Sequence, residues 1–117
     1  TPIEPPSTLP LGAICQACLD QRAGSDFLTT LNAGGDTVRG PLYTVISTIY
    51  DEVVTPYQSQ ALVGPSGQVT NVVIQDLCSL DPIEHDQTPN DPVVQQLVSA
   101  ALNRSTGPLD PGYRPTC

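Results

Sequence analysis

This chain of 117 residues contains no methionine and no lysine, and both absences are informative. Because translation begins with methionine, a chain that starts at Thr1 and has none is expected to be a processed product or a piece of a longer protein. Four arginines stand against twelve acidic residues, and the resulting net charge of −8 would repel a phosphate backbone or an anionic lipid surface. Nucleic acid is therefore not an expected partner.

Long apolar stretches are also missing. No run is long enough to span a bilayer, so no transmembrane segment is expected, and residues 1–10 have neither the basic nor the apolar region of a signal peptide. Thirteen prolines and few aromatic residues are typical of disorder. However, hydrophobic residues make up 38 % of the chain and gather in periodic segments, which disordered chains lack. We therefore expect a globular protein with proline-rich connections.

The four cysteines are Cys15, Cys18, Cys78 and Cys117. An even number in an acidic, lysine-free chain favours disulfides formed in an oxidising compartment, and hence secretion. A zinc site that uses Cys15 and Cys18 is a less favoured alternative, because the sequence has no second closely spaced pair. A thioredoxin-like redox site is weaker still, because no buried strand precedes Cys15. No metal or cofactor is expected.

The first third of the chain predicts short elements. Residues 1–10 form an extended, proline-broken arm, and residues 11–24 form a short helix or turn. Ser25 or Asp26 is the expected N-cap of another short helix, which Gly34-Gly35 ends. No internal repeat and no second domain is evident, so residues 1–117 are expected to belong to one domain.

Two strands and a longer helix follow. Residues 42–49 and 69–75 are rich in β-branched residues, as in strands buried on both faces of a parallel sheet. Asn90 or Asp91 should cap the helix, and Gly107-Pro108 should end it. Helical spacing predicts one apolar face made of Val93, Val94, Leu97, Val98, Ala101 and Leu102.

These elements do not complete a domain. Parallel strands need further neighbours and helices on both faces, and two strands with about three helices cannot supply them. The predicted fold class is therefore α/β, with this chain forming one end of a larger parallel sheet.

Asp51 directly follows the first predicted strand, and His85 lies in the loop shortly after the second. In open α/β sheets, sites form beyond the carboxyl ends of the strands, so both side chains should point into one crevice. Serine hydrolases use such a pair: the acid orients the imidazole, and the imidazole takes the proton of the serine. Two plainer interpretations stay open. His85, between Glu84 and Asp86, could be a solvated surface residue, and Asp51 could simply cap a turn.

Several segments form a specific combination. The run Asn32-Ala33-Gly34-Gly35 precedes a strand that leads into Asp51-Glu52-Val53-Val54-Thr55-Pro56, and Cys78 precedes Ile83-Glu84-His85. After the last predicted helix, residues 100–117 bring a final cysteine back. From about residue 25 to its end, the chain thus resembles the secreted α/β-hydrolase lipases grouped with Candida antarctica lipase B and its actinobacterial relatives. In that family the matching aspartate and histidine belong to the catalytic triad.

The resemblance implies the C-terminal part of an α/β-hydrolase fold, acting on lipids or other carboxylic esters. It makes Asp51 the triad acid and His85 the triad base. It also implies that Val53 and Val54, just beyond the acid, line the acyl pocket, although plain packing under the loop would explain them equally well.

The same resemblance implies a disulfide between Cys78 and Cys117. In the chain-entropy model, a disulfide that closes a loop of this length stabilises a fold by roughly 3–4 kcal/mol. Cys15 and Cys18 then remain for a second, local disulfide.

No segment reads Gly-x-Ser-x-Gly, the turn that carries the nucleophile of an α/β-hydrolase. Gly64-Pro65-Ser66-Gly67 has the wrong spacing and a proline in the turn. The serine and the oxyanion hole are therefore expected on an N-terminal portion of the same protein, which would be the partner of this chain. Alone, the chain is expected to be inactive.

Two other functions remain open. One is a non-catalytic secreted binding module stabilised by disulfides, which would leave the strand-end Asp51 and His85 unexplained. The other is a related hydrolase of polyester or cutin-like substrates, or an acyltransferase, with the same triad and a different pocket. Asn103-Arg104-Ser105 is a glycosylation sequon, usable if the source is eukaryotic.

Overall fold

The structure is a computed structural model that describes residues 15–117. The arm predicted at residues 1–10 lies outside the described residues. In chain order the elements are α1 (Gln16–Asp20), α2 (Asp26–Asn32), β1 (Tyr43–Ser47), the 3-10 helix η2 (Tyr57–Gln60), β2 (Val69–Val73), α3 (Ile74–Leu77), the 3-10 helix η3 (Thr88–Asn90) and α4 (Pro92–Asn103).

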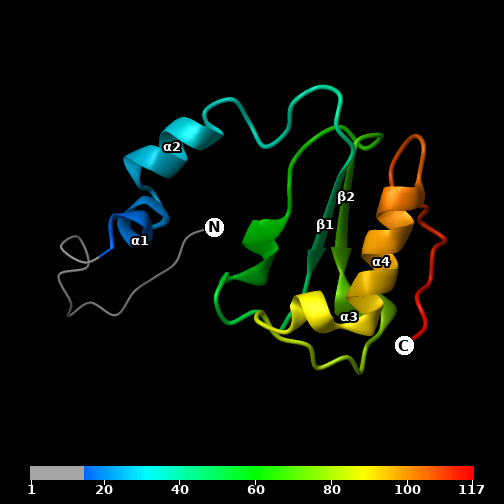
Figure 1. Cartoon of the computed structure of the whole chain (residues 1–117). Coiled ribbons are helices and arrows are strands. Elements are labelled where there is room, and N and C mark those ends of the chain that lie inside the picture. Colours follow the sequence, from blue (N-terminus) through cyan, green and yellow to red (C-terminus); the bar gives the residue numbers. More distant parts are fainter. Residues whose placement is uncertain (1–14) are drawn as a thin grey trace.

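The centre of the structure is a parallel pair of strands (Figure 1). β1 and β2 run in register from Tyr43 opposite Val69 to Ser47 opposite Val73. This confirms two parallel strands with flanking helices, in agreement with the α/β class. Within the described residues the strands are only half-buried, and Ser47 alone among their residues is buried. Burial on both faces, expected for strands inside a larger sheet, stays a prediction.

α4 packs against one face of this sheet and supplies half of the core residues. Asp91 is its N-cap, and the Asp91 carboxylate accepts a hydrogen bond of 2.8 Å from the Val94 N–H. Ile74 and Leu97 are fully buried at the centre of the core. The predicted apolar face is only partly covered, because Val98 is 42 % and Leu102 79 % exposed. The core residues are Ile74, Cys78, Val93, Val94, Leu97 and Leu109.

Two predicted boundaries are wrong. The second strand ends at Val73, and Ile74 and Gln75 begin α3 instead of continuing the strand. The turn into α3 places the Ile74 side chain under α4, where burial outweighs its preference for a strand. α4 ends at Asn103, four residues before the predicted glycine, because Arg104 is extended and donates a hydrogen bond to Thr44 on β1.

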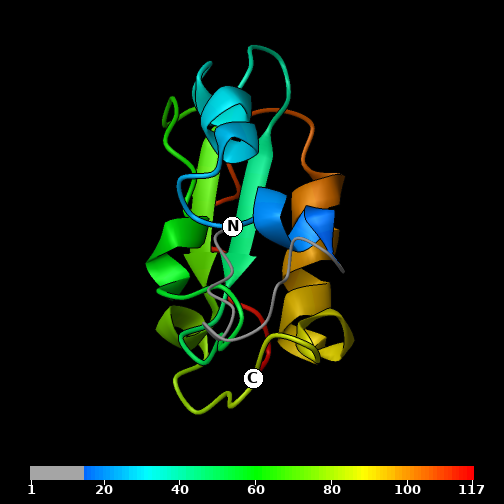
Figure 2. The same cartoon turned by 90° about the vertical axis from the view of Figure 1, so that its left-hand side faces the viewer.

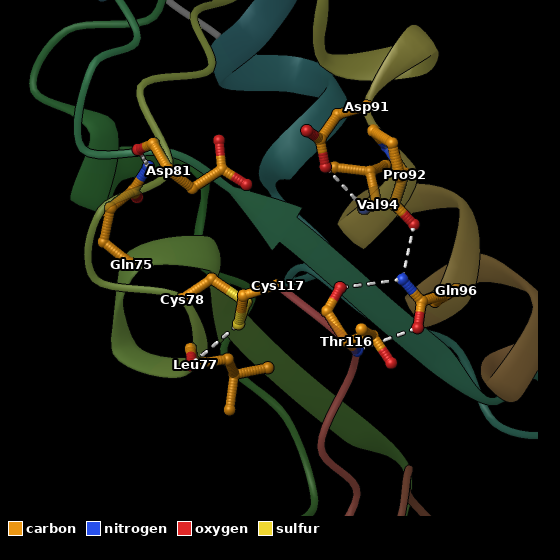
Figure 3. The surroundings of a disulfide bond; sticks show 10 residues. All are labelled: Gln75, Leu77, Cys78, Asp81, Asp91, Pro92, Val94, Gln96, Thr116 and Cys117. Atoms are coloured by element: carbon orange, nitrogen blue, oxygen red, sulfur yellow. Dashed lines mark hydrogen bonds between the residues drawn. A yellow bond between two sulfur atoms is a disulfide. The ribbon is translucent and has the colours of Figure 1, made fainter.

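A disulfide and a hydrogen-bonded tail complete the core (Figure 3). Cys78, just after α3, is bonded to Cys117, which is 39 residues later in the chain. Gln96 on α4 holds the same tail: its amide donates to the Thr116 carbonyl at 3.1 Å and accepts from the Thr116 N–H at 2.9 Å. The tail is therefore fixed to both α3 and α4.

α1 and α2 form a separate pair to one side of the sheet, away from α4 (Figures 1 and 2). Cys15 is the N-cap of α1 and forms a disulfide with Cys18, which leaves neither thiol for the alternative zinc site. Ser25 caps α2, as predicted, by accepting a hydrogen bond from the Leu28 N–H. None of the helices in residues 15–117 has the length and apolar character needed to cross a membrane.

Candidate active site

Asp51 lies in a tight turn just after β1. One carboxylate oxygen, Oδ1, accepts hydrogen bonds from the backbone N–H groups of Val53 at 3.0 Å and Val54 at 2.7 Å. The other oxygen, Oδ2, accepts from the side-chain amide of Gln60 at 2.9 Å. Only 5 % of the Asp51 side chain is exposed. The sequence forms this turn because an aspartate can satisfy the N–H groups two and three residues further on.

His85 comes from the loop after α3, and the structure brings its ring against the Asp51 carboxylate. Nδ1 lies 3.0 Å from Oδ1 and 2.9 Å from Oδ2. Because an ionised carboxylate can only accept hydrogen bonds, Nδ1 carries the proton in this pair. Within the described residues Nε2 has no hydrogen-bond partner, and the side chain is 37 % exposed. The far nitrogen is therefore open to a further group.

Each member of the pair changes the proton affinity of the other. Burial raises the pKa of Asp51, but the hydrogen bonds from His85, Val54, Val53 and Gln60 outweigh it and bring the pKa below its usual 3.8. The hydrogen bond to Asp51 raises the pKa of His85 above its usual 6.5, in spite of partial burial. The negative charges of Asp51, Asp86 and Glu52 act in the same direction. At neutral pH the Asp51 carboxyl group is thus ionised, and its charge favours the doubly protonated, positively charged form of the His85 ring.

The two loops that meet at this pair are joined by a cluster of hydrogen bonds around the buried Thr48. The Thr48 hydroxyl, on a side chain only 1 % exposed, donates to the Ile83 carbonyl at 2.7 Å. Gln75 donates to the Thr48 hydroxyl and to the Asp81 carbonyl, and its oxygen accepts from the Ile49 N–H, each at 3.0 Å. These bonds fix the loop after β1 against the loop that carries His85.

A hollow of about 510 Å³ opens beside the pair. Its wall combines the polar pair and Gln60 with apolar side chains of β1 and α4. The apolar part consists of Ile46, Val94 and Val98, together with Pro89 from η3. The free side of the histidine thus borders a partly apolar depression.

Val53 and Val54 have a backbone function that the sequence did not reveal. Their N–H groups bind Asp51, the Val54 side chain is buried, and neither residue lines the hollow beside the pair. Their role in an acyl pocket stays a prediction. Sequence reasoning missed Gln60, Thr48 and Gln75, because single polar residues in a loop or an apolar strand produce no pattern.

A family model described as Lipase (class 2) matches residues 5–98, a stretch that includes both Asp51 and His85. No curated protein matches the chain.

Proposed function

This chain belongs to the class 2 lipase family, and on that premise we propose that Asp51 and His85 are the acid and the base of a Ser-His-Asp ester hydrolase. The nucleophilic serine lies in another portion of the same protein, and the complete fold is an α/β-hydrolase of the Candida antarctica lipase B group. The observation that carries the proposal is the position of His85, with Nδ1 against both oxygens of Asp51 and Nε2 free.

This geometry suits one chemical task. The free Nε2 would take the proton of the serine hydroxyl while the serine oxygen attacks the carbonyl carbon of an ester. The resulting imidazolium would donate that proton to the departing alcohol, and a water molecule would then repeat the cycle on the acyl-enzyme. Asp51 stays ionised, holds the productive tautomer of His85 and stabilises its positive charge.

The open side of β1 supports the existence of a further portion. Within residues 15–117, β1 pairs with β2 alone, so its second edge has no partner strand. A hollow between β1 and α4 is lined by apolar side chains that include Leu42, Val98 and Leu102, and these three are exposed. An unpaired edge flanked by exposed apolar residues suits the continuation of the sheet. We place the serine-bearing N-terminal portion there.

The substrate class follows from the family and the hollow. A lipid or other carboxylic ester presents an apolar chain and a polar reacting centre, and the hollow offers both kinds of wall. Two disulfides in the described residues suit an oxidising compartment, and secretion is therefore part of the proposal. Hydrolysis of polyester or cutin-like substrates and acyl transfer would use the same dyad. The chain-length profile of accepted esters would separate these activities from that of a lipase.

The test is a fluorophosphonate probe applied to this chain alone and to this chain joined to the portion that precedes it. We expect no labelling and no ester hydrolysis by the chain alone. The joined protein should hydrolyse p-nitrophenyl esters and carry the label on a serine outside residues 1–117. A labelled serine within these residues would contradict the divided site. No labelling of either sample would favour the non-catalytic binding module.

A further inference from the structure

We propose that Gln60 is a positioning residue, which holds the Oδ2 atom of Asp51 and so fixes the plane of the carboxylate against His85. The catalytic meaning of this inference rests on the proposed function, whereas its structural content does not.

The distribution of donors around Asp51 gives Gln60 a separate task. Both backbone donors, Val53 and Val54, bind Oδ1. Apart from His85 itself, Gln60 is the one donor to Oδ2 among the described residues. Rotation about the Cβ–Cγ bond moves both oxygens together, and the backbone donors resist it only through Oδ1. Gln60 adds a second restraint on the same rotation, through Oδ2.

The backbone around Gln60 is itself fixed. Gln60 ends η2, a single 3-10 turn in which the Ser59 N–H donates to the Pro56 carbonyl at 2.9 Å. Two residues after Gln60, the Leu62 N–H donates to the Asn71 side chain at 3.0 Å, and the Asn71 amide donates to the Leu62 carbonyl at 2.9 Å. Because Asn71 lies on β2, the strand leading toward His85 also anchors the segment that orients the acid.

The proposed role predicts a specific effect of losing the donor. Gln60→Met keeps the length of the side chain but cannot donate to Oδ2. The hydrogen bond between Asp51 and the His85 Nδ1–H should then open more often, which exposes that proton to water. Because the lost hydrogen bond is to a charged group, the exchange of the His85 Nδ1 proton with water should become about tenfold faster.

A matched control exists in the same turn. Gln58 also belongs to η2, but it is exposed and its side chain makes no hydrogen bond in the described residues. Gln58→Met therefore makes the same chemical change without touching Asp51, and it should leave the exchange rate of the His85 proton as it is.

The first measurement is NMR of the full chain. His85 is its only histidine, so the imidazole Nδ1–H signal is assigned without ambiguity. We expect faster exchange in Gln60→Met than in Gln58→Met or the natural chain. Equal exchange in all three would overturn the inference about Gln60 and leave the proposed function intact. If the natural chain and Asp51→Asn gave the same signal, the dyad itself would be absent, and the proposed function would fail with it.

A second variant keeps the test decisive if Gln60→Met does not fold. In Gln60→Glu the new carboxyl group can donate to Oδ2 while it is protonated, but it repels Asp51 once it is ionised. At acidic pH the His85 proton should therefore exchange at the same rate in Gln60→Glu as in the natural chain. As the pH rises, it should exchange faster in Gln60→Glu than in the natural chain. The other charged groups that act on His85 are Asp51, Glu52 and Asp86, and they are the same in both proteins. Identical pH profiles would contradict the inference.

The kinetic measurement uses the complete protein. Misplacing a catalytic group costs rate without weakening substrate binding, so Gln60→Met should lower kcat about tenfold to a hundredfold, with KM changed less than about twofold. Gln58→Met should change neither constant. A change in KM alone would show that Gln60 contacts the substrate, and it would overturn the positioning role.

Discussion

The two loops that meet at the dyad are stabilised in different ways. The Asp51 loop is held mainly by its own backbone, through N–H groups two and three residues away. The His85 loop has a local turn as well, in which the Glu84 carboxylate accepts from the N–H groups of Asp86 and Gln87, but it is also held from a distance, by the Thr48 hydroxyl 35 residues before Ile83 and by a disulfide to Cys117. The first loop thus carries most of its geometry in a short sequence, whereas the second depends in addition on the rest of the fold. Changes in the first should affect chemistry, and changes in the second should affect stability.

The largest expected effect follows from removing the charge of the acid. Asp51→Asn keeps the acceptor that binds Val53 and Val54, so the turn should still form. The amide can no longer stabilise an imidazolium, and the tautomer of His85 is no longer enforced. In the complete protein, kcat should fall about 10⁴-fold, with an unchanged circular dichroism spectrum. Glu52→Gln removes a neighbouring exposed charge and should have little effect. Similar losses in both variants would contradict the assignment of the acid.

The two disulfides should stabilise the folded chain to different degrees. Replacing Cys78 and Cys117 by alanine releases a loop with a sequence separation of 39 and should lower the free energy of unfolding by about 4 kcal/mol. The same change at Cys15 and Cys18, with a separation of 3, should cost about 2 kcal/mol at most. Urea denaturation of the three proteins measures both values. Equal losses in the free energy of unfolding would show that the length of the closed loop does not determine how much the Cys78–Cys117 disulfide stabilises the fold.

A smaller effect is expected from the joint between the loops. Thr48→Val removes a hydroxyl that donates to the Ile83 carbonyl and accepts from Gln75. Because Thr48 is buried, the groups left without partners should cost about 1–3 kcal/mol. The control is Thr30→Val, at an exposed position of α2 that makes no such bonds in the described residues. If both variants had the same stability, the cluster would not join the loops.

The smallest effect concerns pH. The pKa of His85 is raised in the folded chain, chiefly by its hydrogen bond to Asp51. The protonated imidazole therefore adds stability below its unfolded pKa of about 6.5, and this stability is lost as the pH rises through the folded pKa. Solvent screening of the partly exposed ring keeps the effect small. Urea unfolding at about pH 6 and about pH 9 should show a decline in the natural chain and a weaker one in Asp51→Asn. The opposite slope would rule out a raised pKa for His85.

The sequence alone predicted the elements that show a regular spacing of apolar residues or a helix-capping residue. Helical spacing with Asn90 or Asp91 as N-cap identified α4, and two β-rich runs identified the parallel strands. Their carboxyl ends placed Asp51 and His85 in one region, because parallel strands bring such ends together. These inferences depend on patterns that repeat along the chain or on local turn chemistry.

The remaining features depend on contacts between distant segments. Val72, Val73 and Ile74 form a continuous apolar run, so nothing in the sequence indicated that the strand gives way to α3 at Ile74. Gln60 lies in a polar loop and Gln75 follows an apolar run, and the partners of both lie in other segments of the chain. The role of an amide side chain is set by which backbone groups it meets, and this is determined only when the chain folds.

The register of β1 with β2 also has a kinetic consequence. The hydrogen bonds from Val53 and Val54 to Asp51 span two or three residues and can form as fast as a local turn. The bond from His85 spans 34 residues and requires the parallel strands to meet first. Closing so long a loop is slow, because its entropy is lost before any contact compensates for it. The acid turn should therefore be in place early in folding, ready for the histidine that reaches it later.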